Sequence, residues 1–195
     1  PPPPPPPPPN PPPPPPAPHT LPLHDALPIL IYFPPEGSTQ IGPNTDLFHQ
    51  LELDIAEFGS SHNTLILGDF NAHTNTHLDF IDKSNGKEMP DDLIGSDLPC
   101  YNSCIAEGYL KQRTSQDNRP VNNYGKKLLE LCVATNHLIL NGRMNGDLNG
   151  SYTRIENGAK SVIDYGISST NYMPFIKEFK IDQLNPDSDH RGLLV

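Results

Sequence analysis

The residues with the clearest chemical potential follow a short apolar run in the middle of the chain. Leu65-Ile66-Leu67 leads into Gly68-Asp69-Phe70-Asn71-Ala72-His73, so a buried strand would deliver Asp69 and Asn71 to one edge of a sheet. Residues two apart on an extended chain point the same way. A carboxylate there can hold a metal ion or orient a water, and a neighbouring amide can donate a hydrogen bond to a phosphate oxygen. A simple turn explains the segment equally well, because Gly, Asp and Asn are ordinary turn residues.

Two further acids lie near the C-terminus, one of them beside a histidine. Ser188-Asp189-His190 suits a metal ligand next to a general acid, although a capped turn also explains it. Asp164 interrupts the apolar run Ser161-Val162-Ile163-Asp164-Tyr165, and a buried carboxylate without a partner is strongly destabilising. His190 would serve as that partner, unless Asp164 sits at a strand end and faces solvent.

Tyr32 is a candidate of another kind, since a tyrosine at a strand end can present its hydroxyl to a phosphate. The run of residues 30–33 is apolar and β-prone, and Pro34 and Pro35 stop it. An amphipathic tyrosine packed in the core is the more common role for such a side chain.

Strands and helices that alternate along the chain must position these candidates. Apolar residues at helical spacing predict a helix over residues 45–58, with Asn44 or Thr45 as its cap and Gly59 as its stop. A second helix is expected over residues 124–136, and the polar segment 71–123 reads as a loop with one short helix over 101–107. Glu156-Asn157-Gly158 predicts a hairpin. Strands are expected at residues 30–33, 65–67, 137–140, 151–155, 161–168, 179–184 and 192–195. This alternation favours an α/β fold with its sites on the loops.

The first 28 residues differ in composition from the rest of the chain. They hold 18 of the 26 prolines, which predicts a polyproline II rod or a low-complexity segment without a core. A ligand for a proline-binding module is the functional alternative. Residues 19–29 resemble a translated sequencing adapter, which would make residues 1–28 artefactual. We therefore expect residues 1–28 to make no packed contacts and residues 29–195 to form one domain.

Charge and cysteine content narrow the class of protein. A formal net charge of −10 argues against an extended phosphate-neutralising surface, because proteins with such surfaces are usually basic. It is compatible with carboxylates that hold a divalent cation against a phosphate. Cys100, Cys104 and Cys132 are expected to be reduced thiols of an intracellular protein, since no second pair completes a zinc site. No secretory signal and no membrane span are expected.

Taken in order, the four motifs resemble one family. Tyr-x-Pro-Pro, Gly-Asp-Phe-Asn-Ala, Ile-Asp-Tyr and Ser-Asp-His follow one another, each at an expected strand end. This order resembles the endonuclease/exonuclease/phosphatase superfamily, which includes DNase I-like nucleases. The strings GDFNAHT, SYTRIENGAKSVIDYGISS and SDHRGL are most similar to the endonuclease domain of LINE-type non-LTR retrotransposons. The resemblance covers about residues 29–195. It implies an α/β fold, a four-layer sandwich in which two mixed β-sheets face each other between helices.

The resemblance also implies an activity and a role for each motif residue. The activity is metal-dependent hydrolysis of phosphodiester bonds, the nicking of DNA in the nucleus, with Mg²⁺ or Mn²⁺ as cofactor. Asp69 would position the attacking water and contact the metal, and Asn71 would hydrogen-bond the scissile phosphate. Asp189 would belong to the metal shell. His190, held by Asp164, would stabilise the charge that develops on the phosphoryl oxygens.

The chain departs from the family pattern in two places. Tyr32 would contact the phosphate, but Pro35 stands where the abasic-site enzymes carry an Asn. The family's first two motifs, an Asn and a metal-binding Glu, are expected upstream of Ile29. The N-terminal part of the domain would then be missing and the chain would nick DNA poorly. An inositol or lipid phosphatase of the same superfamily and a catalytically dead remnant are the alternatives. The phosphatases carry a Trp-Thr-Asp-Arg segment, and this chain has no Trp.

Overall fold

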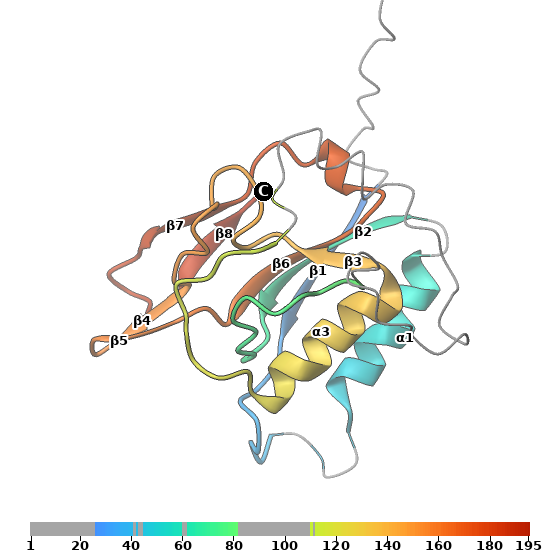
Figure 1. Cartoon of the computed structure of the whole chain (residues 1–195). Helices are drawn as coiled ribbons and strands as arrows, with labels where there is room; N and C mark the ends of the chain where they lie inside the picture. The colour runs from blue at the N-terminus through green and yellow to red at the C-terminus, as the bar shows by residue number, and fades with distance from the viewer. Residues whose placement is uncertain (1–25, 41, 43–44, 60–61, 82–109, 111) are drawn as a thin grey trace, which may run out of the picture.

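The apolar runs of the chain meet in a four-stranded mixed sheet with the order β1-β2-β6-β3 (Figure 1). The computed structural model describes residues 26–40, 42, 45–59, 62–81, 110 and 112–195. β1 (Ala26–Tyr32) runs parallel to β2 (Asn63–Asp69), whereas β6 (Asp164–Ser169) is antiparallel to both β2 and β3 (His137–Ile139). The sheet thus joins segments that lie more than a hundred positions apart in the sequence.

Side chains of β2 are covered on both faces of this sheet, as its continuous apolar run predicts. Ile66 is fully buried in a cluster with residues of the two helices. Leu65 and Leu67 point the other way and pack against a second apolar cluster. Successive side chains of a strand alternate between the faces, so an uninterrupted apolar run needs cover on each side.

Two amphipathic helices cover one face and lie side by side in Figure 1. α1 (Leu47–Gly59) begins after Asp46, whose Oδ1 accepts hydrogen bonds from the backbone N–H of Phe48 and His49 at 3.1 and 3.3 Å. The expected caps, Asn44 or Thr45, are therefore wrong by one or two positions, because Asp46 satisfies the free N–H groups of the first turn. α3 (Asn123–Thr135) is capped as the sequence allows, by the Asn122 side chain. No helix in the described ranges is long and apolar enough to cross a membrane.

A smaller two-stranded sheet and a short 3-10 helix lie against the opposite face. β7 (Lys180–Leu184) pairs with β8 (Arg191–Leu194), and Ile181 and Leu193 pack against the second apolar cluster. The 3-10 helix η4 (Met173–Phe175) adds to the same cluster. Phe179 fits there because β6 carries Gly166, where an added Cβ would lie 2.5 Å from the Phe179 ring. The fold is mixed α/β, with helices on one face of the central sheet and these strands on the other.

The hairpin predicted around Asn157-Gly158 is confirmed. β4 (Arg154–Glu156) and β5 (Ala159–Ser161) are joined by Asn157 and Gly158 with φ angles of 48° and 84°, the left-handed values of a two-residue hairpin turn. The single strand expected over residues 161–168 is instead divided into β5 and β6. The buried Thr153 hydroxyl accepts from the backbone N–H of both Ile163 and Asp164, which fixes the crossing from one sheet to the next.

Residues 26–28 belong to the fold, which corrects the expectation that the first 28 residues make no packed contacts. β1 begins at Ala26, and its first three residues pair in register with residues 63–65 of β2. Pro28 is tolerated because β1 is the edge strand of the described sheet, where a missing N–H leaves no neighbour unbonded. Residues 1–25 of the proline-rich segment lie outside the described residues.

A buried ion cluster anchors the described end of the long polar segment. Asp79 is 1% exposed and binds the guanidinium of Arg143 through both oxygens, at 2.7 and 2.9 Å. Nε of the buried Arg113 lies 3.7 Å from the same carboxylate. Asp79 also accepts from the backbone N–H of Ile139 at 2.8 Å. Residues expected to form a loop therefore reach into the core beside β3.

The cysteine expectation holds for the one cysteine that the structure describes. Cys132 is a free thiol in α3, 1% exposed, and burial raises the pKa of its thiol far above the ordinary value. A thiol in such a place is inert. Cys100, Cys104 and the short helix expected over residues 101–107 lie outside the described residues.

We expect the stability of this fold to decrease below about pH 6.5, in part because of His137. This side chain is 4% exposed, and burial lowers its pKa more than a hydrogen bond to the Thr135 carbonyl raises it. The unfolded chain then binds a proton that the folded chain does not, so stability is complete above the unfolded pKa and is lost as the pH falls. His137→Gln should reduce the dependence of the unfolding free energy on pH between 7.5 and 5.5, by up to about 1.4 kcal/mol per pH unit.

The measurement is urea unfolding of both proteins at several pH values. His49→Gln is the matched control, because the His49 side chain is 66% exposed on α1. Equal pH dependence of His137→Gln and the unmodified protein would show that His137 takes up its proton without unfolding.

Candidate functional site

Three of the candidate residues form one row across the central sheet. Tyr32 of β1 pairs in register with Asp69 of β2, and Asp69 pairs in register with Asp164 of β6. Residues directly opposite on neighbouring strands project to the same face. Tyr32 and Asp69 end their strands and Asp164 begins β6, so the row crosses the sheet at one end of its strands.

Asp69 is held in place by Asn71, although not as an extended strand would hold it. β2 ends at Asp69, and Asn71 adopts a left-handed conformation with φ of 48°. The expectation that Asp69 and Asn71 lie on an extended chain and point the same way is therefore wrong. Its backbone N–H donates to Asp69 Oδ1 at 2.8 Å, and its side-chain amide donates to Asp69 Oδ2 at 3.1 Å and to the Phe33 carbonyl at 2.8 Å. In this geometry the amide orients the carboxylate.

Gly68 allows β1 to come close to this turn. Its φ is +151°, and a Cβ added there would lie 1.9 Å from the Ile31 carbonyl oxygen. A glycine is therefore required directly before Asp69, because any side chain would collide with the backbone of the neighbouring strand. The backbone N–H of Phe33 donates to the Asp69 carbonyl at 2.8 Å and continues the pairing past Tyr32.

Asp164 and His190 form the pair that burial of the acid predicts. His190 Nδ1 lies 2.9 Å from Asp164 Oδ1 and 3.1 Å from Oδ2. The Asp164 side chain is 10% exposed and the His190 side chain 31%. A carboxylate that accepts from Nδ1 fixes the tautomer with Nδ1–H and leaves Nε2 as the nitrogen available to a ligand.

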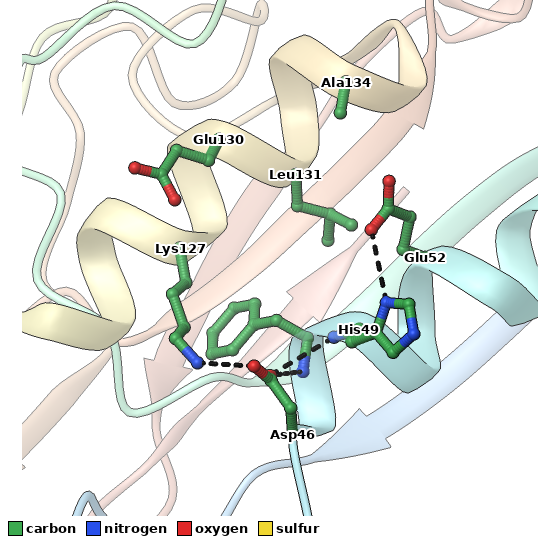
Figure 2. Close-up of a pocket in the computed structure, with 8 residues that line it drawn as sticks. Asp46, His49, Glu52, Lys127, Glu130, Leu131 and Ala134 are labelled. Atoms are coloured by element: carbon green, nitrogen blue, oxygen red, sulfur yellow. Dashed lines mark hydrogen bonds and ion pairs between the residues drawn. The ribbon is translucent and has the colours of Figure 1, made fainter.

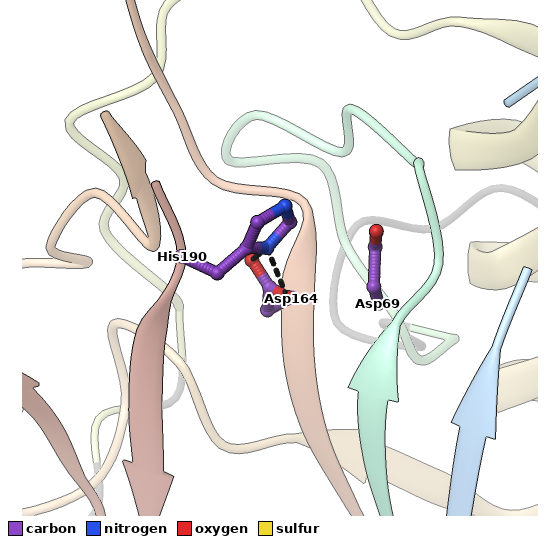
Figure 3. A group of neighbouring side chains, drawn as sticks. All are labelled: Asp69, Asp164 and His190. Carbon is purple, nitrogen blue, oxygen red and sulfur yellow. Dashed lines mark hydrogen bonds and ion pairs between the residues drawn. The ribbon is translucent and has the colours of Figure 1, made fainter. Parts of the chain in front are cut away.

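The side chains of Asp69, Asp164 and His190 gather at one end of the central strands (Figure 3). One ligand atom from each lies within 4.8 Å of the others, a grouping that could hold a metal ion. Burial raises the pKa of Asp164 against hydrogen bonds from Thr153 and His190 that lower it. Burial also raises the pKa of Asp69, the Asn71 backbone N–H opposes this, and repulsion by Asp164 adds to it.

This donor set fits a divalent cation. Two carboxylates that are partly withdrawn from water and repel each other are stabilised by a cation between them. Carboxylate oxygens are the ligands that Mg²⁺ and Mn²⁺ prefer, and the ions complete their coordination with water.

The structure does not bring Asp189 into this cluster. Asp189 Oδ2 accepts from Nε of Arg154 at 2.7 Å, and this hydrogen bond lowers the pKa of Asp189. Its backbone carbonyl accepts from the N–H of Ile155 at 2.8 Å. The expected contribution of Asp189 to a metal shell thus requires its ion pair with Arg154 to open.

Tyr32 lies at the open side of the row. It is 61% exposed, which excludes the alternative of a core tyrosine. Its position beside Asp69 on the neighbouring strand suits contact with a bound molecule.

Thr153 and Arg154 were not assigned roles from the sequence. The Thr153 hydroxyl positions Asp164, and Arg154 binds Asp189. The segment Thr153-Arg154 belongs to the string that carries the family resemblance. That string was the only sequence feature that pointed to these two residues. The pairings themselves depend on segments that are distant in sequence.

A pocket of about 340 Å³ lies elsewhere, between the N-terminal part of α1 and the outer side of α3 (Figure 2). Two pairs of its lining residues interact: Lys127 with Asp46 at 2.7 Å, and His49 with Glu52 at 3.7 Å. None of the four motifs contributes a residue to this pocket.

No protein-family model and no curated protein matches this chain. A proposal of function therefore rests on the geometry of the cluster and on the order of the motifs.

Proposed function

We propose that this chain is a metal-dependent phosphodiesterase that nicks DNA, an endonuclease of the endonuclease/exonuclease/phosphatase superfamily similar to those of LINE-type retrotransposons. The observation that carries the proposal is the convergence of Asp69, Asp164 and His190, which come from three of the four ordered motifs, within 4.8 Å. The proposal includes the four-layer sandwich. In it, β7 and β8 belong to the second sheet, on the face of the central sheet opposite to α1 and α3.

A bound Mg²⁺ or Mn²⁺ would neutralise charge on the phosphate and on the leaving oxygen. Asp69 would hold the ion or the attacking water, and Asn71 fixes the orientation of its carboxylate. Asp164 holds Nδ1 of His190, so that Nε2 is presented to a phosphoryl oxygen. Tyr32, exposed beside Asp69, would contact the phosphate.

With Nε2 of His190 directed to the phosphate, the carboxylates of Asp69 and Asp164 are the protein ligands left for the ion. We therefore expect the ion to bind weakly, with a dissociation constant on the order of millimolar. Nicking should therefore be slow and should require millimolar Mn²⁺ or Mg²⁺.

The test is conversion of supercoiled plasmid to the open circular form by the full chain at millimolar Mn²⁺. We expect slow nicking that EDTA abolishes and that Asp69→Ala lacks, and no release of phosphate from an inositol phosphate under the same conditions. Release of inorganic phosphate without nicking would favour the phosphatase alternative. Absence of both activities in a folded protein would favour a catalytically inactive domain.

A further inference from the structure

Arg154 lies next to His190, although the two residues are far apart in the sequence. Arg154 is the first residue of β4 and forms an isolated antiparallel bridge with His190. Next to this bridge, the backbone N–H of Ile155 donates to the Asp189 carbonyl. The hairpin thus brings a guanidinium to the edge of the cluster.

The guanidinium of Arg154 does not use all of its hydrogen-bond donors within the described part of the chain. Nε donates to Asp189 at 2.7 Å and Nη2 to Glu156 at 2.5 Å. No residue in the described part of the chain accepts a hydrogen bond from Nη1. The side chain is 34% exposed, and both acceptors are more exposed than it is. Exposed ion pairs of this kind contribute little to stability, so this one can be exchanged for another anion.

The acids around the cluster need a cation before a phosphodiester can approach. Four of them surround Arg154: Asp69, Asp164, Asp189 and Glu156. Burial raises the pKa of both Asp69 and Asp164, and the charge of Arg154 acts against this rise at each of them. The bridge with His190 and this charge together bring Arg154 within range of the cluster. The neighbouring Arg191 cannot take this role, because its guanidinium donates to main-chain carbonyl groups before β4 and in β7.

We propose that Arg154 binds the phosphodiester group of the substrate at this site. Its planar guanidinium would exchange Glu156 and Asp189 for two oxygens of the phosphate, a bidentate geometry that arginine forms and lysine does not. Release of Asp189 would then let that carboxylate turn toward the cluster. The identity of the ligand rests on the proposed function, and the choice of Arg154 rests on its contacts.

The experiment measures binding of a fluorescently labelled DNA duplex to the full chain, with Ca²⁺ in place of Mg²⁺. Arg154→Gln should weaken binding on the order of tenfold to a hundredfold, and Arg154→Lys should recover only part of the loss. Glu156→Gln should tighten binding by about twofold to fivefold, because Arg154 loses a competing acceptor. Lys127→Gln is the matched control. Its ion pair with Asp46 has the same 2.7 Å distance and similar exposure, but lies on the helical face.

Equal affinity of Arg154→Gln and Lys127→Gln would overturn the inference, because charge alone would then explain the effect. An Arg154→Lys variant that binds as the unmodified protein does would overturn the bidentate contact. If the unmodified protein nicks plasmid and only the Arg154 prediction fails, the proposed function stands. An unmodified protein that neither binds nor nicks DNA contradicts both.

Discussion

Replacement of Asp79 by asparagine is expected to lower the free energy of unfolding by about 3–5 kcal/mol, because it removes a buried carboxylate that neutralises two buried guanidinium groups. Asp79 neutralises Arg143 through two short hydrogen bonds and lies 3.7 Å from Arg113. Both arginines are at most 3% exposed. Asparagine keeps the size of the side chain but removes the negative charge, so two guanidinium groups would remain in the core beside β3.

Urea unfolding at neutral pH measures this effect. The control is Asp46→Asn, which breaks the exposed pair between Asp46 and Lys127 and removes the same charge. Exposed pairs contribute about 0–1 kcal/mol. If the two variants lose similar stability, the ion cluster around Asp79 is not a stabilising element, and the described part of segment 71–123 is held by its apolar contacts.

The second large effect concerns catalysis, and it rests on the proposed function. His190→Gln should lower the rate of metal-dependent nicking by about 10²–10⁴-fold, the usual contribution of a positioned acid or base. Asp164→Asn should cause a loss of similar size, since Asp164 fixes the tautomer of His190. The double variant should be no slower than the slower single variant, because the two side chains act as one unit.

Initial rates of plasmid nicking test this, with His49→Gln as a control that changes an exposed histidine in the pocket between α1 and α3. Thermal unfolding of each variant separates loss of chemistry from loss of fold. Additive losses in the double variant would contradict the pairing of Asp164 with His190 as a functional unit. Wild-type nicking by His190→Gln would exclude His190 from the site.

The sequence predicts this site where a single local requirement decides the outcome. A carboxylate in an apolar strand needs a partner, and that requirement identifies the contact between Asp164 and His190. Asn-Gly between two β-prone segments likewise identifies the hairpin of β4 and β5. In both cases a few adjacent residues define the physical requirement, so the sequence alone is enough to predict the contact.

Other contacts depend on distant segments and were missed. Asp189 turns to Arg154 because β4 bridges the residue after it, a pairing that the sequence near Asp189 does not reveal. The turn at Asn71 also involves a distant segment, because the side-chain amide of Asn71 donates to the Phe33 carbonyl. Asp79 lies in a polar segment that reads as a loop, and only the buried arginines explain its position.

The row of Tyr32, Asp69 and Asp164 determines where the chain can change in length during evolution. Each residue reaches the end of the sheet at which the cluster lies by its register with the strand beside it. A shift of one residue would turn its side chain to the opposite face. A single-residue insertion inside β2 or β6 would therefore turn Asp69 or Asp164 away from the cluster, although the residue would still be present. Insertions in the connections between the strands leave the strand register unchanged. We therefore expect related sequences to vary in length between β2 and α3 and after η4.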